Sequence, residues 1–130
     1  MYRGIFIPGN VPSSKNGRRW TGRYFIVSKQ TQRYYKSSKK YWIEYKKEFQ
    51  KLLKGKDSQN KKPYRITLKF VRKSRHKFDY VNPAQTIQDQ MVKYGWITDD
   101  NADEMIPIFL EFVYDKDNPG VYINVLKSKK

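Results

Sequence analysis

Apolar and polar residues alternate along several short stretches of the chain, and this two-residue period predicts β-strands. The predicted strands are Tyr2–Pro8, Tyr24–Val27, Tyr64–Arg72, Met105–Tyr114 and Gly120–Leu126. In the third of them Ile66, Leu68 and Phe70 fall on one face, as expected for a strand that covers a core. Pro107 lies inside the fourth, which indicates an edge position or a bulge there.

Two other stretches have the three- and four-residue spacing of helices. The first runs from about Gln30 to Lys54, and its apolar stripe consists of Tyr41, Trp42, Tyr45, Phe49, Leu52 and Leu53. The second spans residues 83–94, with Asn82 as its predicted cap and Gly95 as its end. Residues 9–23, rich in Gly, Asn, Ser and basic side chains, are expected to form a loop.

The resulting order, β-β-α-β-α-β-β, predicts an α+β fold in which a small mixed β-sheet has two helices packed against it. A chain of 130 residues suits one domain, so we expect a single domain over residues 1–130, with 127–130 as a frayed tail. Hydrophobic residues make up 38% of the chain, enough for a folded core.

Composition excludes several classes of protein. The chain has no Cys, which excludes disulfides, thiolate metal sites and Cys nucleophiles. No apolar run approaches the length of a membrane span, and the run at the start is too short for a signal peptide. We therefore expect a cytoplasmic protein without a membrane partner.

Charge narrows the function further. The formal net charge of +16 predicts a polyanionic partner, because neutralising phosphates releases condensed counterions. Residues 1–78 hold 23 Lys+Arg against 3 Asp+Glu, a net of +20, whereas residues 79–130 hold 5 against 9, a net of −4. Carboxylates repel phosphate, so a protein that merely coats DNA has little reason to gather them. A nuclease has a reason, since carboxylates hold the divalent cations that bridge to a scissile phosphate.

Three of these acids flank the second predicted helix. Asp79 precedes it, and Asp99 and Asp100 follow it. If the helix packs back on the sheet, these carboxylates can converge on a magnesium ion. In the simpler interpretation, residues 99–101 form only a turn and Asp79 pairs with Arg75 or Lys77.

Two basic segments could guide DNA to the acids. The predicted DNA-binding residues are Lys15, Asn16, Arg18, Arg19 and Arg23 in the early loop, and Arg72, Lys73, Arg75, His76 and Lys77 before Asp79. Trp20 could stack on an exposed base. Alternatively, both segments are solvated. His76 is the only histidine, so a His-based metal site is not expected.

The run DYVNPAQTIQDQMVKYGWITDD, residues 79–100, resembles the signature of the RusA family of Holliday junction resolvases, the crossover junction endodeoxyribonucleases. That family has an Asp-x-Asp-Asn opening, a helix with a central Asp, a Gly-aromatic exit and a closing Asp-Asp. The matching residues are Asp79, Asn82, Asp89, Gly95, Asp99 and Asp100. The segment IPGNVPSSKNGRRW and the strand GVYINV are similar to the family's first loop and last strand.

The resemblance implies a RusA-like fold and a homodimer that binds four-way or other branched DNA. It implies paired, symmetric nicks made with Mg²⁺ or Mn²⁺ during DNA recombination and repair. The implied catalytic metal ligands are Asp79 and Asp100, with Asp99 as their neighbour. The family often travels with phage genes, and such a protein would associate with the nucleoid through DNA.

Two positions depart from the family pattern. The second opening Asp is Val81 here, and a Lys one helical turn later is Gln85. Val cannot bind a metal, so either another acid replaces it or activity is reduced or lost. Asp89 is the first candidate, because it lies four residues from Gln85 on the same helical face. Two alternatives remain: a non-catalytic DNA-binding protein on the same fold, and an RNA-binding accessory protein.

Overall fold

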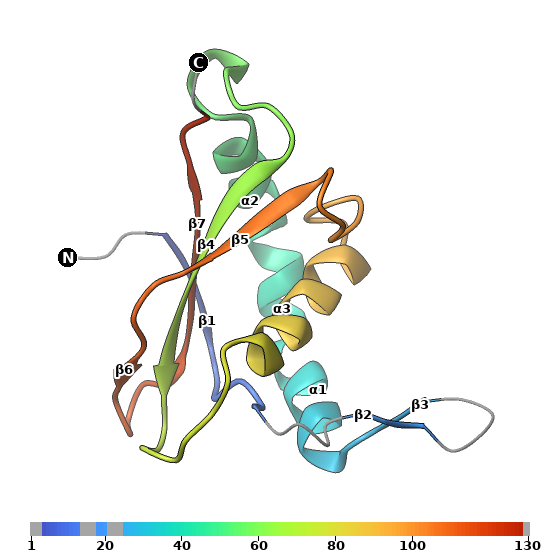
Figure 1. Cartoon of the computed structure of the whole chain (residues 1–130), viewed down its shortest axis with the longest axis vertical. Coiled ribbons are helices and arrows are strands. Elements are labelled where there is room, and N and C mark those ends of the chain that lie inside the picture. Colours follow the sequence, from blue (N-terminus) through green and yellow to red (C-terminus); the bar gives the residue numbers. More distant parts are fainter. Residues whose placement is uncertain (1–3, 14–17, 21–24, 129–130) are drawn as a thin grey trace.

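The computed structural model describes residues 4–13, 18–20 and 25–128 (Figure 1). The strands are β1 (Ile5–Pro8), β2 (Arg18–Trp20), β3 (Phe25–Val27), β4 (Tyr64–Arg72), β5 (Met105–Phe109), β6 (Val113–Tyr114) and β7 (Gly120–Leu126). The helices are α1 (Lys29–Glu44), α2 (Lys46–Lys54) and α3 (Val81–Lys93), with a 3-10 turn at Lys56–Ser58.

The main sheet has five strands in the order β1-β7-β4-β5, with β6 also paired to β4. It is mixed: β7 runs antiparallel to β1 and β4, whereas β5 and β6 run parallel to β4. The strands β2 and β3 form a separate two-stranded ribbon, which projects from the body in Figure 1. The predicted α+β class with a mixed sheet is therefore confirmed.

The core fills the space between the sheet and the helices. Ile66, Leu68 and Phe70 of β4 are at most 1% exposed, which confirms the face predicted from their alternation. From the helices, the fully buried Trp42 and Phe49 pack into the same cluster, together with Ile5, Ile7, Ala84, Ile87, Met91, Trp96, Val121 and Ile123 among others. Burial of this apolar surface is the main force that holds α1, α2 and α3 on the sheet.

The helices differ from the prediction in two respects. The long first helix is divided at Tyr45, which ends α1 and precedes α2. The second predicted helix, α3, starts two residues early at Val81, so Asn82 lies in its first turn and does not cap it. Gly95 has a φ of 74° directly after the helix, where its lack of a Cβ permits the left-handed turn that was expected.

Strands were missed or merged where a turn interrupts the pattern. The predicted early loop contains β2, which pairs with β3. The fourth predicted strand is two strands, β5 and β6, separated at residues 110–112. Pro107 does lie on an edge strand, β5. Ser128, expected in a frayed tail, is hydrogen-bonded through its backbone N–H to Asn60 and through its hydroxyl to Lys61.

None of the helices within the described residues has both the length and the apolar character required to cross a bilayer.

Candidate functional site

Two loops, one on each side of α3, contain the acids that the sequence singled out. Loop 73–80 leaves the last residue of β4 and leads into α3. Loop 95–104 leaves α3 and leads into β5, whose first residue, Met105, is paired with Tyr64 at the start of β4. The chain therefore enters α3 from the C-terminal end of β4, and after α3 it returns to the N-terminal end of β4. The positions of the acids depend on α3 and on these two loops.

Loop 95–104 is fixed to the helices by Trp96. Its indole is fully buried, donates a 2.7 Å hydrogen bond to the carbonyl of Trp42, and stacks on Phe49 with a centroid separation of 4.6 Å. Gln50 of α2 donates to the carbonyls of Gly95 and Trp96 at 2.9 and 3.1 Å. The aromatic exit residue thus ties the acidic loop to α1 and α2.

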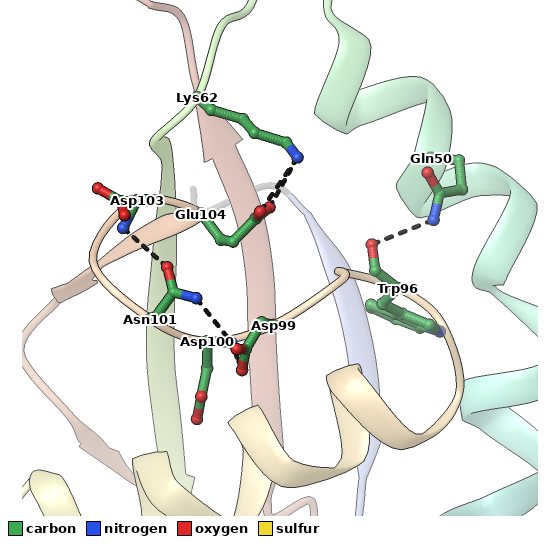
Figure 2. A network of polar contacts seen from close by, with 8 residues as sticks. All are labelled: Gln50, Lys62, Trp96, Asp99, Asp100, Asn101, Asp103 and Glu104. Atoms are coloured by element: carbon green, nitrogen blue, oxygen red, sulfur yellow. Dashed lines mark hydrogen bonds and ion pairs between the residues drawn. The ribbon is translucent and has the colours of Figure 1, made fainter.

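Hydrogen bonds within the loop hold Asp99 in place (Figure 2). Its carboxylate accepts from the backbone N–H of Asp100 at 2.7 Å and from the side chain of Asn101 at 3.0 Å. These two hydrogen bonds, the first above all, lower the pKa of Asp99 below its ordinary value. Asn101 also accepts from the N–H of Asp103 at 2.9 Å. The local hydrogen bonds of Asp99 fit the simpler interpretation of residues 99–101, but the backbone turn itself begins at Asn101, whose carbonyl accepts from the N–H of Glu104 at 3.0 Å.

Farther along, Glu104 fastens the loop to the start of β4. Its carbonyl accepts from the N–H of Tyr64 at 2.8 Å, and its carboxylate lies 2.9 Å from the ammonium of Lys62. The salt bridge raises the pKa of Lys62. These contacts give Glu104 a role in joining two segments.

Asp100 and Asp89 are arranged differently from Asp99. In Figure 2 the Asp100 side chain points to the side of the loop opposite Asn101. On α3, Gln85 donates a 2.9 Å hydrogen bond to Asp89, which confirms that these two residues share a face. Gln85 thus orients the acid that was considered as a replacement for the one missing at Val81.

Loop 73–80 borders a hollow of about 660 Å³ that contains Asp79. The lining residues are Ser13, Arg75, His76, Lys77, Phe78, Asp79, Tyr80, Asn82 and Phe112. Arg75, His76, Lys77 and Asp79 are all exposed, so the hollow combines basic side chains with one carboxylate in reach of solvent. The structure thus places Asp79 beside the predicted phosphate-binding segment, while Asp89, Asp99 and Asp100 do not line this hollow.

One wall of the hollow is a cluster of aromatic rings. Phe78 meets Tyr80 and Phe112 edge-on, with centroid distances of 5.3 and 5.0 Å. The Tyr80 hydroxyl accepts a 3.1 Å hydrogen bond from the backbone N–H of Phe112, and Phe109 stacks on the Tyr80 ring at 5.4 Å. The cluster joins loop 73–80 to the segment between β5 and β6.

Arg72 does not match its predicted role. We expected it to contact phosphate, but it is only 5% exposed, and its guanidinium lies 4.1 Å from the Phe78 ring centroid. Its Nη1 donates to the carbonyl of Val11 at 3.5 Å, and burial lowers its pKa. Because β4 ends here against the core, the Arg72 guanidinium packs on the ring of Phe78 and does not reach solvent.

The other predicted DNA-binding residues divide into two groups. Lys73, Arg75, His76 and Lys77 are exposed as expected. Lys15, Asn16 and Arg23 lie outside the described residues, and the backbones of Arg18 and Arg19 belong to β2.

The acids do not form a closed metal cage. Among the described residues, no three His, Asp or Glu side chains lie close enough together to hold a metal ion. The predicted donors, Asp79, Asp89, Asp99 and Asp100, supply only oxygen. This chemistry fits Mg²⁺, which is commonly bound by one or two carboxylates together with substrate phosphates and several waters.

The aromatic wall was not predicted from the sequence. Its members come from two segments more than 25 residues apart, FDY at 78–80 and FLEF at 109–112. The available signal was the three-residue spacing of Phe109, at the end of β5, and Phe112 just after it, because one face of a strand cannot bury both rings. Their meeting with Phe78 and Tyr80 depends on the parallel pairing of β4 with β5 and β6.

Neither protein-family models nor curated proteins provide a match to this chain.

Proposed function

We propose that this protein is a metal-dependent endodeoxyribonuclease of the RusA type, which binds branched DNA and nicks it in DNA recombination and repair. The main support is the position of Asp79, an exposed carboxylate in a hollow that Arg75, His76 and Lys77 also line. Basic side chains draw a phosphate into such a hollow, and a carboxylate there can bind a cation that bridges it to the phosphate.

Under this proposal the cation is Mg²⁺ or Mn²⁺, with Asp79 and Asp100 as its expected protein ligands and Asp99 and Asp89 as supporting acids. Because the described acids do not form one cluster, substrate phosphate and water would fill the other positions around the ion. When bound, such a cation supplies an activated water and offsets the charge that develops on the phosphate. The protein's own part is to position the donors. Trp96 and the hydrogen bond between Asp99 and Asn101 hold the segment that bears Asp100, and Gln85 orients Asp89.

The DNA is proposed to be a four-way junction. Symmetric nicking of such a substrate requires two active sites, so the active form is a homodimer. The net charge of +16 supports a strong, salt-dependent attraction to the DNA arms, and the alternative of an RNA partner rests on charge alone. Equal affinity for a junction, duplex DNA and single-stranded RNA at physiological salt would favour RNA.

The direct test is incubation of a fluorescent four-way junction with the protein and Mg²⁺. We expect nicks from the wild type, and loss of at least about a hundredfold in rate for Asp79→Asn and for Asp100→Asn. Both variants should bind the junction as tightly as the wild type or more tightly, because each removes a negative charge near phosphate.

Asp117→Asn is the matched control, since Asp117 is exposed in the turn before β7 and does not line the hollow that contains Asp79. It should nick like the wild type. A wild-type protein that binds the junction with Mg²⁺ or Mn²⁺ but leaves it intact would refute the nuclease proposal. Weaker binding by Asp100→Asn would instead show that Asp100 is structural.

One observation favours a second candidate, a structure-selective DNA-binding protein without catalysis. Val81, where the family has an acid, is 64% exposed at the start of α3, so no carboxylate is available at that position. Calorimetry with Mn²⁺ separates the two candidates: the nuclease should bind Mn²⁺ and lose that binding in Asp79→Asn, whereas the non-catalytic protein should release no heat.

A further inference from the structure

The hollow beside Asp79 has two kinds of wall, and phosphate binding explains only one of them. Arg75, His76 and Lys77 can contact a phosphate, but the apolar rings of Tyr80 and Phe112 do not attract one. Phe112 remains 37% exposed although it is a large apolar side chain. An exposed aromatic ring next to basic side chains is the pattern of sites that stack nucleic-acid bases.

We propose that the hollow binds a single unstacked DNA base, which rests on Phe112 and Tyr80 while its backbone phosphate is held by Arg75 and Lys77. The proposal rests on the proposed function for the choice of DNA as the ligand. It adds the part of the DNA that is recognised: a base that has left the helical stack next to the phosphate.

The size and chemistry of the hollow suit this ligand. Its volume of about 660 Å³ is within the range of sites for small organic ligands, and larger than a phosphate alone requires. Ser13 and Asn82 also line it, and their side chains can hydrogen-bond to the polar edge of a base. A base has both an apolar face and a polar edge, as the hollow does.

The wall is held in place before any ligand arrives. The hydrogen bond from the Phe112 N–H to the Tyr80 hydroxyl, at 3.1 Å, fixes these two residues relative to each other. Phe78 lies between the Phe112 ring and the buried guanidinium of Arg72. A preformed surface loses little conformational entropy when a base binds, which favours stacking.

Asp79 connects the proposed base site with the proposed site of cleavage. Asp79 lies between Phe78 and Tyr80 in the chain and lines the same hollow. A base seated on Phe112 would therefore bring its adjoining phosphate close to this carboxylate. Branched and bulged DNA contains bases that unstack at little cost, whereas continuous duplex does not, so the hollow would also select for irregular DNA.

A matched pair of DNA duplexes tests the proposal without any cleavage. The first contains one bulged nucleotide, and the second contains the same bulge with an abasic residue, so that the two differ only in the base. In EDTA, we expect the wild type to bind the bulged base about tenfold more tightly, equivalent to about 1.4 kcal/mol. Equal affinity for the two duplexes would overturn the proposal.

Two variants locate the effect. Phe112→Ala should bind both duplexes with equal affinity, at the level of the wild type with the abasic bulge. Phe6→Ala is the control, because Phe6 is an aromatic residue that packs against Tyr122 and does not line the hollow. It should retain the tenfold preference.

Thermal denaturation checks that each variant is folded. If Phe112→Ala does not fold, Phe112→Leu, which keeps the apolar bulk but has no ring, replaces it in the binding experiment. Persistence of the preference in both Phe112 variants would overturn the assignment. Junction nicking is measured separately from base binding. If the two bulged duplexes bind equally, the base site is refuted but the nuclease proposal is not. If the junction is not nicked, the affinities for the two bulged duplexes still test the base site.

Discussion

Adjacent residues of identical type have different roles in loop 95–104. The carboxylate of Asp99 accepts from the N–H of Asp100 and the amide of Asn101, whereas the side chain of Asp100 points to the side of the loop opposite Asn101. From the sequence, only the resemblance to the RusA signature distinguishes these two acids. The two hydrogen bonds commit Asp99 to the structure of the loop, which makes Asp100 the better candidate for a metal ligand.

Asp99 should make the stability of the protein depend on pH. Its folded-state pKa is lowered by its hydrogen bonds, so it stabilises the fold fully above the unfolded pKa of about 4. That contribution is lost as the pH falls from there through the lowered folded pKa. Thermal melting across this acidic range should show a steeper decline for the wild type than for Asp99→Asn. Asp103→Asn, which keeps the backbone N–H that Asn101 accepts, is the control.

Val81 allows a gain-of-function test. Because this side chain is 64% exposed at the start of α3, Val81→Asp places a solvated carboxylate two residues from Asp79 without disturbing the core. If Asp79 helps to bind a cation, the added charge should tighten Mn²⁺ binding by about tenfold. Calorimetry measures the affinity. Val113→Asp adds the same charge at another exposed position and should change nothing; equal tightening in both variants would mean a nonspecific charge effect.

At the scale of elements, Trp96 joins the exit of α3 to the other two helices. Trp96→Phe keeps a ring against Phe49 but removes the donor to the carbonyl of Trp42, which is then left buried without this partner. We expect a loss of about 1–3 kcal/mol in the free energy of unfolding, measured by urea denaturation. Gln50→Ala, which removes partly exposed hydrogen bonds to the same loop, should cost less. The reverse order would contradict the anchoring role of the indole.

The elements that sequence predicted best are those whose pattern is set by burial on one face. β4 and β7 have the predicted bounds because each crosses the centre of the sheet, where the core enforces alternation. Prediction was less accurate where the environment changes within an element. The apolar run 105–114 is interrupted at residues 110–112, and the first helix is divided at Tyr45 without any Gly or Pro.

The candidate site was predictable only in part for the same reason. Asp79 and its basic neighbours are contiguous in sequence, so their common location needs no tertiary information. The aromatic wall and the burial of Arg72 depend on which segments the sheet brings together, and no local pattern encodes that pairing. The resemblance to RusA ranked the acids, but it gave no sign of the hydrogen bonds that distinguish Asp99 from Asp100.

On the scale of the whole molecule, charge limits how two copies could meet. Residues 94–115 contain no Lys or Arg, and β5, at the edge of the sheet, lies within this segment. Two molecules of net charge +16 repel each other least where such a segment forms the contact, and β5 leaves Ile106 and Phe109 partly exposed. The proposed homodimer is therefore expected to form through this edge.

Ile106→Lys tests this interface. Ile106 is 44% exposed, so a charge there should leave the fold intact but separate the dimer, at a cost of at least about tenfold in the dissociation constant measured by sedimentation. Ile43→Lys provides the control on α1, where the residue is 57% exposed. A dimer that survives Ile106→Lys but not Ile43→Lys would place the contact on the helices instead.

The location of β7 also has a consequence for how the protein is made. This strand lies between β1 and β4, and within the described residues it is the only strand that pairs with β1. The ribosome nevertheless synthesises it after all the other strands of the sheet. During translation β1 therefore has no strand to pair with until residues 120–126 have been synthesised. The sheet therefore cannot form strand by strand during synthesis. We expect it to form in one cooperative step after β7 has been synthesised.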